Sequence, residues 1–108
     1  MEPNPEKKKL LEYAQQHPEY YPIMQSGVFI KIIKALEKEA KNIEDICEMF
    51  SSIDKEDFKE IINTLIKVGL VSKLTFSEKI LYYTNENGTE FLKYCNLAKN
   101  AFDVTDGQ

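Results

Sequence analysis

The feature that most constrains this fold is an amphipathic helical segment that stops at a glycine. Directly after it, the residue pattern changes from one typical of a helix to one typical of β-strands. Residues 54–68 carry one apolar helical face, made of Phe58, Ile61, Ile62 and Leu65. Gly69 stands where a left-handed residue commonly ends a helix. Residues 70–76 and 80–84 are then rich in β-branched and aromatic side chains, which predicts a hairpin of two short strands. Its loop, 77–79, contains no glycine, so the turn type stays open.

Within residues 26–102, two helices are expected before this segment and one after it. Ser26 is a suitable N-cap for a helix to about Ala40, and Asn42 for a short one over residues 43–50. Asp54 is expected to cap the segment that ends at Gly69. Asn85 is expected to cap the last helix, whose apolar positions are four, three and four residues apart: Phe91, Cys95, Ala98 and Phe102.

The first 25 residues differ in character from the rest. Residues 5–16 predict a short polar helix that His17 and Pro18 stop. Residues 19–24 predict an irregular segment, either a strap packed over the core or an interface, because adjacent tyrosines and flanking prolines do not favour a regular helix. The expected organisation is therefore a polar helix and strap over 1–25, a main domain over 26–102 and a flexible tail over 103–108.

Composition excludes several classes of protein. A chain of 108 residues is long enough for one domain, and no apolar run approaches the ~18 residues of a membrane span. The proline-rich, charged start does not read as a signal peptide, so we expect a cytoplasmic protein. Cys47 and Cys95 are expected to be buried thiols, and with His17 as the single histidine we expect no metal and no cofactor. No catalytic constellation or glycine-rich phosphate loop is present, which argues against an enzyme.

The order helix, short helix, turn, helix, two strands, helix resembles a winged helix-turn-helix domain. Residues 57–71 resemble the recognition helix of small prokaryotic regulators, in which a leucine and three residues precede Gly-Leu-Val. Residues 82–88 resemble the exit from the wing, with Asn85 in place of the usual threonine cap. The resemblance covers about 26–102 and is closest to compact archaeal or bacterial members. It implies a mainly α fold with a small β-hairpin: a three-helix core, a two-stranded wing and a C-terminal helix.

That resemblance also implies a way of binding double-stranded DNA. The third helix would enter the major groove, where Asn63 can pair with adenine and where Lys59 or Lys67 can reach guanine or phosphate, with Lys55 beside them. On the wing, Lys73 and Lys79 are the candidates for backbone contacts. Small regulators of this kind often form homodimers, here through the last helix, the N-terminal segment or both.

The charge of the chain argues the other way. Its net charge is −4, all fourteen basic residues are lysine, and three lysines face four carboxylates between Asp54 and Lys67. An electrostatic footprint for DNA should be clearly positive. Two functions therefore stay open: a homodimeric, DNA-binding transcriptional regulator, or an acidic protein-protein interaction module that does not bind DNA.

Overall fold

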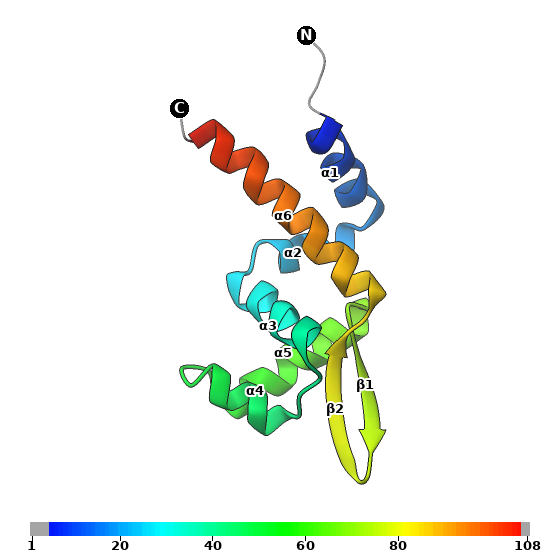
Figure 1. Cartoon of the computed structure of the whole chain (residues 1–108), viewed down its shortest axis with the longest axis vertical. Coiled ribbons are helices and arrows are strands. Elements are labelled where there is room, and N and C mark those ends of the chain that lie inside the picture. The colour runs from blue at the N-terminus through cyan, green and yellow to red at the C-terminus, as the bar shows by residue number, and fades with distance from the viewer. Residues whose placement is uncertain (1–4, 107–108) are drawn as a thin grey trace.

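The computed structural model describes the backbone of residues 5–106 and the side chains of residue 5 and residues 7–98. The central body carries a hairpin at one end, and the first and last helices extend from the opposite end (Figure 1). The molecule is elongated, measuring 57 × 26 × 21 Å along its principal axes. Its elements in chain order are α1 (Pro5–Gln16), the 3-10 helix η1 (Pro18–Tyr20), α2 (Tyr21–Met24), α3 (Gly27–Lys38), α4 (Ile43–Met49), α5 (Lys55–Val68), β1 (Val71–Phe76), β2 (Lys79–Thr84) and α6 (Glu86–Asp106).

The helix boundaries follow the predicted capping residues. The Ser26 hydroxyl accepts a hydrogen bond from the Phe29 amide at 3.3 Å, and the Asn42 side-chain oxygen accepts one from the Asp45 amide at 2.8 Å. Gly69 ends α5 in the left-handed region with φ of 89°. Asp54 occupies the N-cap position of α5, but its carboxylate makes no capping hydrogen bond. The capping signals thus place the helix ends, although Asp54 does so without the expected contact.

The predicted irregular strap is wrong in its local structure, because η1 and α2 are both helical. Pro18 and Pro22 each fall within the first two positions of a short helix, where a missing N–H costs no intrahelical hydrogen bond. Tyr20 and Ile23 from these turns are buried, which stabilises the conformation. The prolines therefore start these helices instead of preventing them.

The hairpin loop is also shorter than predicted. The antiparallel register runs from Val71 opposite Thr84 to Phe76 opposite Lys79, so Lys79 belongs to β2. The loop contains Ser77 and Glu78 alone, with φ of 48° and 67°. Two positive φ values in a two-residue loop are the signature of a type I′ turn, whose twist matches that of the strands.

At its C-terminal end, α6 continues through residues 103–106, which the sequence assigned to a tail. Residues 107 and 108 of that predicted tail lie outside the described part of the chain, as do residues 1–4.

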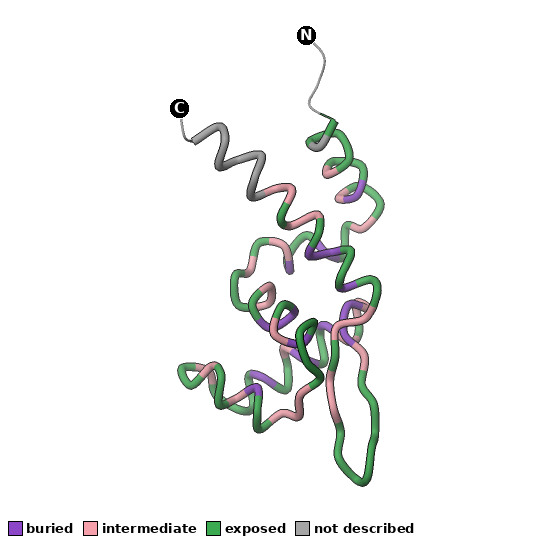
Figure 2. The backbone as a smooth tube through the Cα atoms, in the orientation of Figure 1, coloured by how far each residue is buried: buried purple, intermediate pink, exposed green. Residues whose placement is uncertain are grey.

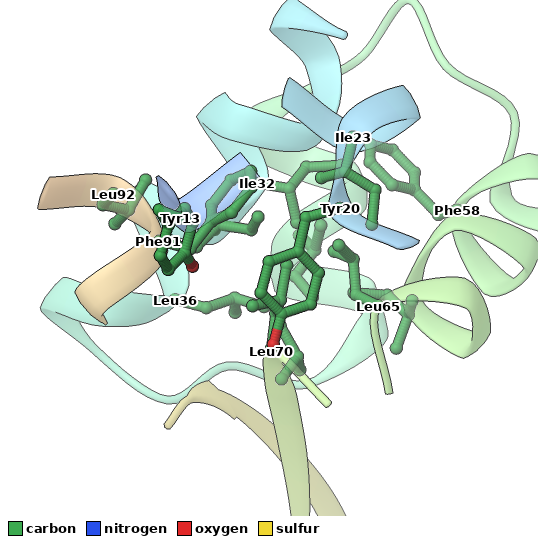
Figure 3. Close-up of a cluster of buried hydrophobic side chains, with 14 residues drawn as sticks. Tyr13, Tyr20, Ile23, Ile32, Leu36, Phe58, Leu65, Leu70, Phe91 and Leu92 are labelled. Atoms are coloured by element: carbon green, nitrogen blue, oxygen red, sulfur yellow. The ribbon is translucent and has the colours of Figure 1, made fainter. Parts of the chain in front are cut away.

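The core lies where η1, α2, α3, α5 and α6 meet (Figure 2). Phe58 and Leu65 of α5 and Ile32 and Leu36 of α3 belong to one buried cluster, and every buried side chain among the described residues is hydrophobic or tyrosine (Figure 3). Most of the hairpin beyond Val71 is exposed. The core therefore fixes one side of α5 and leaves its other side in solvent.

Candidate nucleic-acid interface

The predicted DNA-reading residues of α5 lie along one line on its surface. Phe58, Ile62 and Leu65 are no more than 1% exposed and hold the helix on the body. The candidates are all exposed and recur every fourth residue, which places them in a row on a helix: Lys55, Lys59, Asn63 and Lys67. The structure therefore brings these four predicted residues together.

Two of these lysines already have acidic partners. The Lys55 ammonium lies 3.3 Å from the Glu44 carboxylate of α4, and the Lys59 ammonium lies 3.4 Å from that of Glu56. A backbone hydrogen bond at Glu44, followed by the bond from Lys55, lowers the pKa of this carboxyl below its ordinary value. Exposed pairs of this kind are weak because solvent screens them, so a phosphate can replace the carboxylate at small cost.

The second half of α5 is different. Within the described residues, the side chains of Asn63 and Lys67 have no hydrogen-bond or ion-pair partner. An amide with its donors and acceptor in solvent is available for a base edge. The C-terminal half of α5 is thus the part of the row whose polar groups are not already paired.

The two predicted wing lysines do not share a face of the hairpin. Lys73 is paired with Tyr82, whereas Lys79 is paired with Phe76. Because side chains alternate along a strand and directly paired residues point the same way, Lys73 and Lys79 lie on opposite faces. A partner that approaches one face of the wing reaches one of these two lysines directly.

The face that bears Lys79 is largely apolar, a feature that the sequence reasoning missed. Leu74, Phe76 and Tyr83 lie on it with exposed fractions of 52%, 66% and 37%, and Leu81 is half-buried beside Leu74. The available signal was the two-residue alternation at 74 and 76 and at 81 and 83. This outer wing face, defined as Leu74, Phe76, Leu81 and Tyr83, is unlike a phosphate-binding surface.

The base of the wing is held rigidly against the body. Lys41, just after α3, forms an antiparallel bridge with Tyr82 through hydrogen bonds of 3.0 and 2.8 Å. The Thr84 hydroxyl donates to the Ile33 carbonyl at 2.7 Å. These bonds fix the position of the wing relative to α3 and so relative to α5.

Asn85 joins the end of α5 to the start of α6. Its side-chain oxygen accepts from the Gly88 amide at 3.0 Å, which is the predicted cap. Its side-chain amide also donates to the Gly69 carbonyl at 3.0 Å and to the Ser72 hydroxyl at 2.9 Å. The added bonds tie the end of α5, the first strand and the last helix to a single side chain.

The remaining reactive groups do not form a metal or redox centre among the residues whose side chains are described. No group of three His, Cys, Asp or Glu side chains is placed to hold a metal ion there. Cys47 and Cys95 are free thiols and half-buried, less enclosed than predicted, and burial raises the pKa of Cys95 to about 11. The His17 ring stacks on Tyr20, with centroids 4.7 Å apart.

None of the described helices is both long and apolar enough to span a membrane.

No protein-family model matches the sequence, and comparison with curated proteins finds no relative. Solved structures do match. The apo form of MarR from E. coli superposes with a TM-score of 0.68 at 14% identity, over 100% of this chain and 88% of that one. An ArsR-like transcriptional regulator from Rhodococcus sp. RHA1 gives 0.65 at 14% identity, over 89% and 85% of the two chains. A possible HxlR family transcriptional factor from Thermoplasma volcanium GSS1 gives 0.63 at 20% identity, over 82% and 83%.

These similarities agree with the arrangement described above. In this chain α3, α4 and α5 form the three-helix core, β1 and β2 form the wing, and α6 follows as the C-terminal helix. The predicted fold class is confirmed: the chain has a winged helix-turn-helix fold.

Proposed function

We propose that this chain is a DNA-binding transcriptional regulator that acts as a two-fold dimer. The observation that carries the proposal is the row of exposed polar side chains along α5, from Lys55 to Lys67, on a fold whose solved neighbours are transcriptional regulators. The outward helix of such a fold is shaped to enter a major groove. The proposal thus assigns the row to DNA contact.

Each residue of the row has a role in this proposal. The Asn63 amide reads adenine through paired hydrogen bonds, and Lys67 reaches a neighbouring guanine or phosphate. Lys55 and Lys59 exchange their carboxylate partners for phosphates, and Lys73 contacts the backbone beside the groove. Lys79, next to the hairpin loop and on the face opposite Lys73, takes a phosphate at the edge of the site.

The carboxylates on α5 set the conditions under which binding occurs. Glu56, Asp57 and Glu60 are exposed on the same helix and repel phosphates. Each phosphate neutralised by a lysine contributes a slope of roughly −0.9 to the dependence of log affinity on log salt. We therefore expect weak binding that is favoured at low ionic strength.

The dimer proposal rests on the two elements that extend away from the wing. In Figure 1, α1 and α6 run from the body on the side opposite the hairpin. The two helices pack against each other, as the stacked rings of Tyr13 and Tyr94 attest. A two-fold axis through this end leaves both α5 helices free to meet half-sites about 34 Å apart on one side of a duplex.

Fluorescence anisotropy with a labelled AT-rich duplex tests the proposal at low salt. The double variant Lys59→Ala with Lys73→Ala should weaken binding about equally for all sequences. Because it removes two lysines from each protomer of the dimer, it should reduce the magnitude of the salt slope by roughly 3.6. Asn63→Ala should instead relax the preference at one base pair. Gel filtration with and without the duplex reports the dimer. Absence of detectable binding at low salt would rule out the DNA-binding proposal.

A second candidate function is favoured by the acidic surface of α4. Glu44, Asp45 and Glu48 are exposed, and Glu44 already neutralises Lys55. Such a surface suits a basic protein partner better than a phosphate backbone. Affinity capture that recovers a protein but no nucleic acid, and that is lost in Glu44→Lys with Glu48→Lys, would favour this function over DNA binding.

A further inference from the structure

A hollow of about 430 Å³ opens between α3 and the end of α4. It shares no lining residue with the row on α5 that carries the proposed DNA contacts. Its rim is formed mainly by lysines from α3 and the residues just after it: Lys31, Lys34, Lys38 and Lys41. The structure places these lysines around one concavity.

The charge around the hollow is opposite in sign to that of the whole chain. Four lysines and one acidic residue, Glu39, line it, whereas the chain carries a net charge of −4. Glu39 lies 3.4 Å from the Lys41 ammonium. Lys31, Lys34 and Lys38 are exposed and have no ion-pair partner among the described side chains. The rim therefore favours an anion.

The other lining residues of the hollow are apolar, and we call them its floor. They are Ala35, Met49 and Phe50, and the Phe50 ring packs on the fully buried Phe58 with centroids 5.7 Å apart. Met49 is 52% exposed, and its flexible thioether can adapt to the shape of an apolar ligand. A bare inorganic anion would leave this floor uncovered.

One wall of the hollow is preformed. Lys41 is held through its backbone to Tyr82 of the wing, and its side chain is 20% exposed. A wall fixed in this way loses little conformational freedom when a ligand binds. The size of the hollow lies within the range of small-molecule sites, about 300–1,000 Å³.

We propose that the α3–α4 hollow binds a small amphiphilic anion, with a carboxylate or phosphate headgroup held by the lysine rim and an apolar body on the floor of Ala35, Met49 and Phe50. Both halves of the ligand are required, because the rim supplies charge without apolar contact and the floor supplies apolar contact without charge. The proposal does not depend on DNA binding.

A ¹⁵N NMR titration of the full chain with octanoate tests this. We expect saturable shifts at the amides of Ala35 and Phe50, and binding about tenfold weaker for acetate and for octan-1-ol, each of which lacks one half of the ligand. Lys31→Ala with Lys38→Ala should weaken octanoate binding about fivefold to tenfold, from the loss of two exposed charge pairs. Met49→Glu, which places a carboxylate on the floor, should abolish it.

The matched control is Lys59→Ala with Lys73→Ala, which removes the same charge elsewhere and should leave octanoate binding unchanged. Equal binding of octan-1-ol, equal binding of acetate, or shifts centred on the outer wing face would each overturn the proposal. The two double variants separate this site from the proposed DNA interface, because each removes the lysines of one site and leaves those of the other.

Discussion

The ring of Tyr13 in α1 stacks on the ring of Tyr94 in α6, with centroids 4.0 Å apart and planes 12° from parallel. Tyr13 is 4% exposed, and Tyr20 packs edge-on against Phe91 of α6 at 5.6 Å. The N-terminal segment and the last helix thus share an aromatic cluster, of which Figure 3 shows Tyr13, Tyr20 and Phe91.

Removing the Tyr13 ring should release α1 from α6. We expect Tyr13→Ala to lower the free energy of unfolding by about 2–4 kcal/mol, because a buried aromatic side chain and its ring contacts are lost. Tyr21→Ala is the matched control, since Tyr21 is 58% exposed, and it should change stability by less than about 0.5 kcal/mol. Urea unfolding followed by circular dichroism measures both. Equal effects of the two substitutions would contradict this role for Tyr13.

The raised pKa of Tyr13 predicts that the protein loses stability at alkaline pH. Burial raises the pKa of Tyr13 above its ordinary value of 10.0, so the folded state keeps a proton that the unfolded state releases. The protonated hydroxyl therefore contributes to the free energy of unfolding. This contribution is fully present below pH 10 and is lost as the pH rises towards the higher pKa of the folded state. The difference in unfolding free energy between pH 8 and pH 11 should therefore be larger in the wild type than in Tyr13→Phe. Tyr20, whose pKa is also raised, is present in both proteins and cancels. Identical pH profiles would count against the shift.

Much of the fold could be predicted because its signals are local. Ser26, Asn42 and Asn85 cap helices through contacts three residues away, and Gly69 ends α5 by its own conformation. Short-range hydrogen bonds of this kind are visible in a sequence as residue types at fixed spacing.

The candidate site was predictable only in part, because the rest of it depends on register and packing. The observed hairpin loop is one residue shorter than the predicted one, which places Lys79 in β2 and not in the loop. The register of the strands then decides whether Lys79 lies on the same face of the hairpin as Lys73 or on the opposite face. The pair between Lys55 and Glu44 spans eleven positions and needs the packing of α4 on α5. The hollow at Lys31 and Lys38 likewise exists because Met49 and Phe50 approach from another helix.

Asn85 provides a test of this difference between local and tertiary signals. An aspartate in its place keeps the capping oxygen but loses the two donations to the Gly69 carbonyl and the Ser72 hydroxyl. We expect Asn85→Asp to cost about 1–3 kcal/mol of unfolding free energy, because the carboxylate then faces a carbonyl without a proton between them. Asn42→Asp is the control, since the Asn42 side-chain oxygen serves as a cap to Asp45, and it should be nearly neutral. Similar losses in both variants would mean that Asn85 acts as a cap alone.

Gly88 is required by a close approach of chains. A Cβ atom at this position would overlap the Leu70 carbonyl oxygen and the Thr84 methyl group. Gly88→Ala should therefore lower the free energy of unfolding by about 1–3 kcal/mol and loosen the wing from α6. A Cβ atom at Gly27 would meet no neighbouring atom within 4 Å, so Gly27→Ala should be neutral or stabilising by up to about 1 kcal/mol. Thermal unfolding of the two variants separates these effects. A Gly88→Ala protein as stable as the wild type would contradict the prediction, because Leu70 and Thr84 would then move aside at little cost.

The tip of the wing stores backbone strain that a substitution can relieve. Ser77 and Glu78 both have positive φ, a region that costs a residue with a side chain about 1–2 kcal/mol. Asn-Gly is the preferred pair for this turn, so Ser77→Asn with Glu78→Gly should raise the free energy of unfolding by about 1 kcal/mol after the entropic cost of glycine. Glu78→Ala is the control, because it removes the same charge without relieving the strain, and it should give no such gain. Urea unfolding compares the three proteins. Equal stability of Glu78→Ala and the double variant would assign the effect to charge and not to the turn.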